Sequence, residues 1–302
     1  MKRKSNQSFS FFIILIILAI LIMFFDRASD KEGGRYIPIL SRLVGHEEKV
    51  EELKPEKTIK LIEGWTIRDI SQYFELEGMW QSEELLELVG FPLVDYREEK
   101  EIPLPKDFSE QFSFLEDKPK HFSLEGYLFP DTYRIYTDAT IEDVVVRMLE
   151  NFDQKLTPEM RAEIKKQGKT IYEIVTMASI IEKEAPIRIG DDRDARLVSG
   201  VFWNRLKIGQ ALQSDATLSY LLNDNNPAHS GSDLEVDSLY NSYKYRGLPP
   251  GPICNPSFLA IKAAIYPIDS NYNYFLTPKN SQEVIYASTY EQHLRNKYKY
   301  LK

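Results

Sequence analysis

The chain has 302 residues, of which 43% are hydrophobic and 28% charged, as in a globular protein with one large or two smaller domains. The net charge of -8, without a long basic cluster in the body, argues against nucleic-acid binding, because that binding depends on Lys and Arg at phosphates. A lone cysteine, Cys254, excludes an intramolecular disulfide and a thiolate metal cluster, and the four histidines lack zinc-hydrolase spacing. We therefore expect neither a metal nor another cofactor.

The N-terminal segment has the pattern of a membrane anchor. Three basic residues at positions 2–4 precede an uncharged stretch that ends with an apolar run. A membrane span needs about 20 mostly apolar residues, and its positive flank stays in the cytoplasm. No small-residue cleavage site follows, which favours an uncleaved anchor. The sequence thus predicts a cytoplasmic tail over 1–8, an anchor over 9–25, a glycine-containing, charged tether over 26–57, and an extracytoplasmic body.

A small module is predicted after the tether. Polar and apolar residues alternate over 58–62, which indicates a strand. Thr66 and Ser82 are good N-cap residues for two short helices that follow. Prolines and charges dominate residues 91–120, which indicates a long irregular connection. The module with its connection is therefore assigned to residues 58–120.

The main body is predicted over residues 121–302. Three polar or rigid segments lie over 213–217, 240–243 and 246–256, and the last is too rich in proline for a helix. Two short strands flank Pro278. Helices and strands mix without βαβ regularity, so the predicted class is α+β. Helix starts are expected at six positions, namely Thr140, Thr157, Thr170, Arg193, Ser257 and Tyr290.

The predicted helix that follows Thr170 carries acids at the end of an otherwise apolar segment. Along this helix Glu182 points toward the apolar stripe that starts at Ile171, and Glu184 points roughly the opposite way. Pro186 ends the helix, so both acids lie in the last turn, where the helix dipole opposes ionisation. Burial acts in the same direction. A carboxylic acid that stays protonated near neutral pH is what general-acid catalysis requires.

A second interpretation of the same segment is an ion pair at a solvated helix end. Lys183, Arg188 and Arg193 are the cations available for such a pair. Helical geometry separates Glu182 from Glu184 but does not choose between them. At this point both interpretations, and both acids, remain open.

Five motifs occur in order along the chain: EGxxxPDTY at 125–133, ASIIEKE at 178–184, VFxNRL with LQSD at 201–215, YNxY at 240–243 and GLPPG at 247–251. This ordered set resembles the endolytic murein transglycosylase family, also called MltG or YceG-like. The resemblance covers roughly residue 58 to the C-terminus, and the family's single N-terminal anchor matches too. The family often carries a full LysM-like module before its catalytic domain. Here only the later strand-helix part of that module is evident, over 58–90.

The resemblance implies that Glu184, the second acid of the IEKE motif, is the catalytic residue of a lytic transglycosylase. Such an enzyme cleaves the β-1,4 bond from N-acetylmuramic acid to N-acetylglucosamine without water and leaves a 1,6-anhydro end. The resemblance further implies nascent peptidoglycan strands as the substrate and the cytoplasmic membrane as the location. Membrane-bound peptidoglycan synthases (penicillin-binding proteins) are the implied neighbours, and control of glycan strand length is the implied role.

Other motif residues are candidates to bind the substrate or to support the acid. The substrate-binding candidates are Gln213, Asp215, Tyr240, Asn241 and Tyr243. Each has an alternative role as a buried hydrogen-bonding residue. The supporting candidates are Glu182, Glu125, Asp131, Asn204 and Arg205. We expect these to brace the fold, pair with charges or cap loops.

Two other functional classes compete with the transglycosylase. A hydrolase acting on the same glycan would use Asp215 or Glu182 as a second carboxylate and would leave a reducing muramic acid end. A non-enzymatic wall-binding scaffold would keep the fold while its buried acid served only the structure. Analysis of the products separates these classes.

Overall fold

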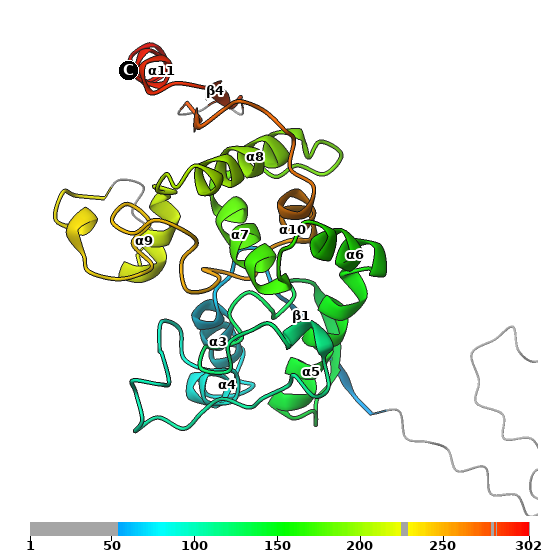
Figure 1. Ribbon diagram of the computed structural model, residues 1–302. Coiled ribbons are helices and arrows are strands. Elements are labelled where there is room, and N and C mark those ends of the chain that lie inside the picture. The colour runs from blue at the N-terminus through cyan, green and yellow to red at the C-terminus, as the bar shows by residue number, and fades with distance from the viewer. Residues whose placement is uncertain (1–53, 225–228, 279–280, 282, 302) are drawn as a thin grey trace, which may run out of the picture. The chain divides into compact units, whose positions relative to one another are not determined.

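The computed structural model describes residues 54–301 except 225–228, 279–280 and 282 (Figure 1). The predicted cytoplasmic tail, membrane anchor and most of the tether lie outside these residues. Within the described part, no helix has the length and apolar character needed to cross a membrane. Pro55–Lys302 forms one compact unit.

Helices dominate the described part of the chain. Its named strands form two antiparallel two-stranded sheets, β1 with β2 and β3 with β4, and the predicted α+β class is confirmed. The elements follow in chain order as β1 (Glu56–Lys60), α3 (Ile67–Leu76), α4 (Ser82–Val89), η1 (Ser113–Leu115), β2 (Thr132–Tyr136), α5 (Ile141–Lys155), α6 (Pro158–Lys166), α7 (Ile171–Glu184), α8 (Arg193–Lys207), α9 (Asp215–Leu222), η2 (Asp233–Glu235), α10 (Phe258–Ile265), β3 (Tyr274–Leu276), β4 (Ile285–Ala287) and α11 (Tyr290–Tyr300).

Side-chain caps set most of the helix starts. A Thr or Ser hydroxyl accepts a hydrogen bond from a first-turn backbone N–H in α3, α5, α6, α7 and α10, as the sequence predicts. Helix α4 differs, because its N-cap is Gln81, and the predicted cap Ser82 is already the first helical residue. Helix α9 forms where the sequence predicts only a polar segment. It is short, and its N-cap Ser214 makes no capping hydrogen bond.

The β1–β2 sheet joins the predicted small module to the predicted main body. Ile59 pairs with Tyr133, and the ladder runs from Glu56 opposite Tyr136 to Lys60 opposite Thr132. The ladder therefore crosses the boundary expected at residue 120. Helix α3 is the next element after β1, and the Ile67 N–H at its start donates a hydrogen bond to Glu125 of the body.

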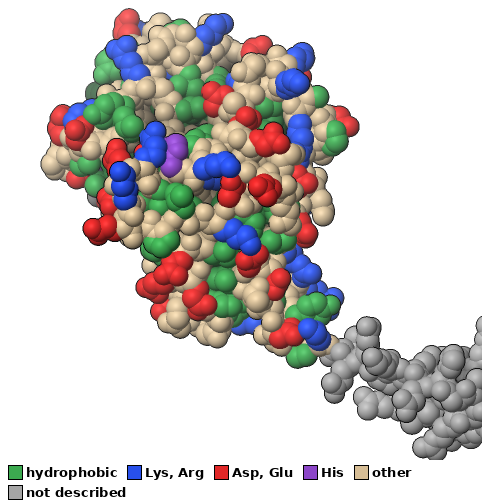
Figure 2. All heavy atoms as spheres, turned by 60° about the horizontal axis from the view of Figure 1, so that its bottom comes forward, with side chains coloured by type: hydrophobic (Ala, Val, Ile, Leu, Met, Phe, Trp, Pro, Cys, Tyr) green, Lys and Arg blue, Asp and Glu red, His purple; other side chains and the backbone are tan. Residues whose placement is uncertain are grey.

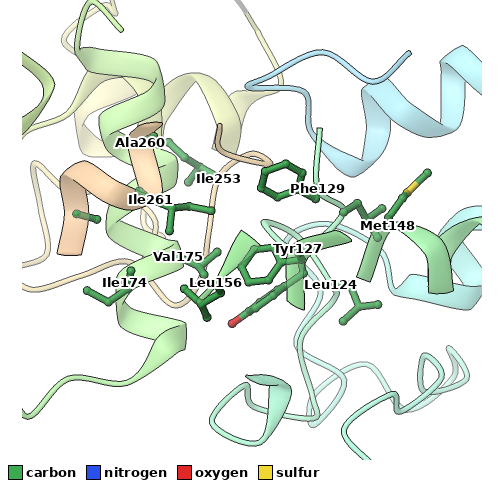
Figure 3. Packing of buried hydrophobic residues seen from close by; sticks show 14 of the residues in the cluster. Leu124, Tyr127, Phe129, Met148, Leu156, Ile174, Val175, Ile253, Ala260 and Ile261 are labelled. Carbon is green, nitrogen blue, oxygen red and sulfur yellow. The ribbon is translucent and has the colours of Figure 1, made fainter. Parts of the chain in front are cut away.

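Helix α7 lies at the centre of the compact unit, with α10 beside it (Figure 1). Every residue from Ile174 to Ile181 is buried, because α6, α8, α9 and α10 all pack on this helix. Tyr127 and Val175 belong to this core (Figure 3). Gly126 has φ +89°, and a Cβ there would lie 2.6 Å from Pro252 Cβ, so the close approach of its loop to the proline-rich segment requires glycine. On the surface shown in Figure 2, acidic and basic side chains are interspersed.

Candidate active site

Glu184 is the last residue of α7, and its carboxyl group meets the start of α9. Glu184 Oε1 accepts hydrogen bonds from Ser214 Oγ at 2.6 Å and from the Ala216 N–H at 3.4 Å. Ser214 is the N-cap of α9, so the carboxyl group lies where backbone N–H groups and the positive end of a helix dipole stabilise negative charge. One helix thus supplies an acid, and another stabilises its conjugate base.

Opposing effects act on the ionisation of Glu184. Burial raises the pKa of the Glu184 carboxyl above its usual value, and the negative charge of Asp215 adds to this rise. The hydrogen bonds from Ser214 and Ala216 lower the pKa, as does the charge of Arg205, but the net shift is upward. The carboxyl group therefore keeps its proton to a higher pH than an ordinary glutamate, and Ser214 and Ala216 are placed to donate hydrogen bonds to its anionic form. A general acid that later acts as a base needs both properties.

A cavity of about 310 Å³ borders Glu184. Its walls come from the start of α3, the end of α7, and α9 with the two residues that follow it, and Ile253 of the proline-rich segment completes them. The volume is at the small end of the range for ligand sites, which is about 300–1,000 Å³. The small module therefore supplies one wall of this cavity.

Glu182 occupies a different environment. Its Oε2 accepts hydrogen bonds from the Ser257 N–H at 2.9 Å and from Ser257 Oγ at 2.6 Å, at the start of α10. Burial raises the pKa of Glu182, and the two bonds from Ser257 lower it in part. Glu182 does not line the Glu184 cavity. The predicted divergence of the two acids is confirmed.

The interpretation of these acids as partners in surface ion pairs finds no support among the described residues. Neither Glu182 nor Glu184 forms an ion pair there. Arg188, one of the cations expected to serve, instead lies 4.0 Å from Asp194. The carboxyl group of each acid instead accepts a hydrogen bond from a serine that is the N-cap of another helix.

The LQSD and YNxY motifs bring Asp215 and Tyr243 together. Asp215 lines the cavity, and its Oδ1 accepts a hydrogen bond from the Tyr243 hydroxyl at 2.6 Å. Gln213 is exposed and does not line the cavity. Its φ of +50° is in the left-handed region, and its N–H donates to the Ser242 carbonyl at 3.0 Å. This uncommon backbone conformation directly precedes Ser214, the donor to Glu184.

Asn241 and Tyr240 lie away from the cavity lining. Asn241 is fully buried, and its Nδ2 donates to the carbonyls of Leu234 and Val236, each at 2.9 Å. Its Oδ1 accepts from the Tyr243 N–H at 3.1 Å. The buried Tyr240 ring packs on Tyr220 with centroids 5.5 Å apart. These contacts match the alternative role of a buried residue that shapes the loop.

Glu125 connects three parts of the cavity wall. It is 2% exposed, and its carboxyl accepts from the Ile67 N–H at 3.1 Å, the Tyr220 hydroxyl at 3.1 Å and Asn255 Nδ2 at 3.3 Å. Ile67 begins α3, and Tyr220 belongs to α9. Burial raises the pKa of Glu125 to about 8, against the lowering effect of these hydrogen bonds. A neutral buried carboxyl therefore anchors α3 against α9.

The remaining supporting candidates brace loops and do not line the cavity. Asn204 Nδ2 donates to two carbonyls before β3, at 2.8 and 3.0 Å. Arg205 Nε donates to the Asn273 carbonyl at 2.7 Å. Asp131 accepts from Asn151 Nδ2 at 3.0 Å. These bonds fix the ends of α8 and β2 around the central helix.

The structure also identifies residues that are not among the sequence-based candidates. Ser214 is the donor to Glu184, and its place between two candidates of the LQSD motif is a signal for it. Arg68 and Tyr220 line the cavity from helices whose sequences give no such signal. Among the described residues, no cluster of three or more His, Cys, Asp or Glu side chains has a metal-binding arrangement.

Comparison with known proteins places this geometry in a family. A profile of the YceG-like family matches residues 23–299. The chain is 37% identical over 179 residues to the endolytic murein transglycosylase of Bacillus subtilis (strain 168), covering 59% of this chain and 48% of that protein. It is also 37% identical over 187 residues to the endolytic murein transglycosylase of Streptococcus pneumoniae serotype 2 (strain D39), covering 60% of this chain and 33% of that protein.

The aligned part thus spans less than half the length of these curated relatives. A crystal structure of a yceG-like protein from Listeria monocytogenes has a similar fold, with a TM-score of 0.64 and 32% sequence identity. That similarity covers 84% of this chain and 80% of the Listeria chain. On the family match and this structural similarity, the chain belongs to the YceG-like family.

Proposed function

We propose that this protein is an endolytic lytic transglycosylase that cleaves the β-1,4 bond from N-acetylmuramic acid to N-acetylglucosamine and leaves a 1,6-anhydro end. The observation that carries the proposal is the Glu184 carboxyl group, whose pKa is raised by burial and which borders a cavity of about 310 Å³. Membership of the YceG-like family and relatives named endolytic murein transglycosylase support the reaction class.

In the first step, protonated Glu184 donates its proton to the glycosidic oxygen as the bond to the muramoyl C1 breaks. Oε1 is held by Ser214 and Ala216, whereas Oε2 has no hydrogen bond among the described residues. We therefore assign the proton to Oε2. The negative charge that remains on the carboxylate is stabilised by the Ser214 hydroxyl and the Ala216 N–H.

In the second step, the Glu184 carboxylate removes the proton from the muramoyl C6 hydroxyl, and that oxygen attacks C1. The new C6–O–C1 bond closes the anhydro ring, and Glu184 regains its proton. One carboxyl group thus acts first as acid and then as base. The sugar's own acetamido oxygen can stabilise the positive charge that develops at C1 in place of a second protein carboxylate.

The hydrolase alternative needs a second carboxylate near the bond. Glu182 is unsuited to this role, because Ser257 holds it at the start of α10, outside the cavity lining. Asp215 does line the cavity, with its Oδ1 bonded to Tyr243. Asp215 is therefore the residue on which a hydrolytic activity would depend.

The proposed setting is the outer side of the cytoplasmic membrane. The N-terminal sequence pattern supports a single-pass anchor with a cytoplasmic N-terminus and an extracytoplasmic catalytic domain. The proposed substrate is the nascent glycan strand, and the proposed role is to limit strand length. Membrane-bound peptidoglycan synthases, the penicillin-binding proteins, are the proposed neighbours, on the basis of the family resemblance.

The test is mass spectrometry of products from nascent, un-cross-linked strands incubated with the full chain. Internal fragments with anhydro ends, absent with Glu184→Gln, are the expected result. Fragments with reducing ends would indicate a hydrolase. Uncut strands, with circular dichroism showing folded protein, would favour a wall-binding scaffold.

A further inference from the structure

Two cationic side chains, Arg68 and Lys183, line the Glu184 cavity. Arg68 belongs to the first turn of α3, and Lys183 precedes Glu184 in α7. Arg68 Nη1 donates one hydrogen bond, to Asn223 Oδ1 at 3.1 Å. Within the described residues neither cation forms an ion pair, and Lys183 forms no side-chain hydrogen bond. Most of the hydrogen-bond donors of these two groups are therefore available to a ligand.

The acids of the same cavity are engaged elsewhere. Asp69 accepts from both the N–H and the hydroxyl of Thr66, each at 2.8 Å, in the capping box of α3. Asp215 accepts from the Tyr243 hydroxyl. Asp224 also has an interaction of its own. Burial raises the pKa of Glu184 above its usual value, which weakens the negative charge of this group relative to an ordinary glutamate. Within the described residues, none of these acids forms an ion pair with Arg68 or Lys183, so both cations of the cavity can contact a ligand directly.

The Arg68 side chain is positioned before any ligand arrives. The carboxyl group of Glu125 accepts from the Ile67 N–H and so fixes the start of α3. Asn223, the C-cap of α9 with φ 53°, holds the guanidinium from the other wall. A guanidinium held in this way suits a carboxylate, because its planar fork forms two parallel hydrogen bonds with the two oxygens. Lys183 adds a point charge to the lining of the same cavity.

We propose that Arg68 and Lys183 bind a carboxylate on the lactyl branch of the muramic acid beside the cleaved bond. This step rests on the proposed function. The branch carries a carboxylate in either of two forms. On a stem-free strand the lactyl group itself ends in one, and on a stem-bearing strand the peptide supplies its own. Helix α3 of the small module is thereby a specificity element of the cavity.

The experiment measures kcat and KM of the full chain on three strand preparations. One carries peptide stems, the second carries stems whose carboxylates have been converted to amides, and the third is stem-free. The variants are Arg68→Gln and, as a matched control, Arg246→Gln, because Arg246 is exposed and does not line the cavity. Thermal unfolding of each variant reports on folding.

Arg68→Gln is expected to raise KM about tenfold on carboxylate-bearing strands, which corresponds to about 1.4 kcal/mol, with little change in kcat. Lys183→Gln is expected to raise KM by a smaller factor, because the Lys183 ammonium group contributes charge without the two parallel hydrogen bonds of a guanidinium. On amidated strands, wild type and Arg68→Gln should have the same KM. Arg246→Gln should match wild type on every preparation.

The strand preparations also distinguish the source of the carboxylate. A KM increase on stem-bearing strands identifies the stem carboxylates, and an increase only on stem-free strands identifies the lactyl carboxylate. Equal KM values for wild type and Arg68→Gln on all strands would overturn the proposal. An equally large increase on amidated strands would do the same, because it would assign Arg68 a structural role.

If the proposed transglycosylase function is wrong, the same experiment gives a different result. If wild type cleaves no strand, the transglycosylase proposal falls, and affinity then tests the carboxylate site. Labelled stem-bearing and stem-free strands are titrated with Glu184→Gln, with and without Arg68→Gln. Weaker binding in the double variant supports the site, whereas equal or undetectable binding overturns it.

Discussion

The last turn of α7 makes similar contacts with the starts of α9 and α10. Glu184 meets Ser214 at the start of α9, and Glu182 meets Ser257 at the start of α10. Each carboxyl group accepts from a serine hydroxyl and a backbone N–H, and burial raises the pKa of both. Only Glu184 borders the cavity. Access to a ligand, rather than burial, distinguishes the two acids.

The serines differ as well. Ser257 Oγ caps its own helix by accepting from the Ala260 N–H at 3.2 Å, and it also donates to Glu182. Ser214 Oγ makes no capping bond, so the hydrogen bond that it donates to Glu184 is its main contact. The α10 contact therefore serves the fold, and the α9 contact serves the acid. This contrast leads to separable predictions.

The largest expected effect is on the rate of cleavage. Glu184→Gln should lower kcat by about 1,000-fold or more, because an amide cannot donate the proton. Glu182→Gln keeps an oxygen that accepts from Ser257, and its rate should stay within about fivefold of wild type. Initial rates of strand cleavage check both values. Similar losses in the two variants would contradict the separation of roles.

The next effect is on stability as a function of pH. The pKa of Glu125 is about 8 in the folded protein against 4.5 for an ordinary glutamate. The unfolded chain therefore releases this proton at lower pH, so the contribution of Glu125 to stability is complete below pH 4.5 and is lost as pH rises toward 8. At about 1.4 kcal/mol per unit, the loss amounts to several kcal/mol.

Urea unfolding at pH 5 and pH 8 measures this effect. Glu125→Gln should remove most of the pH-dependent loss that wild type shows, and the exposed Glu99→Gln should keep it. Glu182 and Glu184 also contribute to the loss of stability as pH rises, because their pKa values are raised in the folded protein. Only the difference between wild type and Glu125→Gln is therefore assigned to Glu125. Equal losses would show that Glu125 ionises normally.

A third prediction compares the two serines. Ser257→Ala removes a helix cap and a donor to a buried carboxyl group, so it should lower the free energy of unfolding by about 1–3 kcal/mol. Ser214→Ala removes no cap and should lower it by less. Urea unfolding at one pH measures both. The reverse order of destabilisation would contradict the assignment of the α10 contact to the fold.

The smallest expected effect is at the rim of the cavity. Tyr243→Phe removes the hydroxyl that donates to Asp215, and its rate should fall by less than about fivefold. Tyr245→Phe is the matched control, because the Tyr245 hydroxyl donates to Asp237, outside the cavity lining. A loss as large as that of Glu184→Gln would contradict a supporting role and would assign the Tyr243–Asp215 pair a direct part in the chemistry.

Local signals in the sequence predict most of the helices. Capping threonines place the starts of α3, α5, α6 and α7 within one residue, because these signals act over a single turn. Helix α9 escapes prediction, since it has eight residues and no side-chain cap. The pairing of β1 with β2 depends on contacts about 75 residues apart, for which neither strand carries a specific signal.

The candidate site is predictable only in part for the same reason. Helical spacing separates Glu182 from Glu184, and the motif resemblance chooses Glu184. Their serine partners lie 75 and 30 residues away along the chain, so only the fold brings them together. Arg68 reaches the cavity because Glu125 holds α3 in place, and no motif marks that contact.

The pH dependence of kcat/KM for wild type and Ser214→Ala tests the central assignment most directly. Activity should fall as pH rises through the pKa of Glu184, which lies above the ordinary 4.5. In the wild type, the hydrogen bond from Ser214 lowers the pKa of Glu184. Ser214→Ala removes this bond, so the pKa should rise and the fall in activity should move to higher pH. Ser257→Ala should leave it in place. A fall that is unmoved by Ser214→Ala, or moved by Ser257→Ala instead, would contradict the role assigned to Glu184.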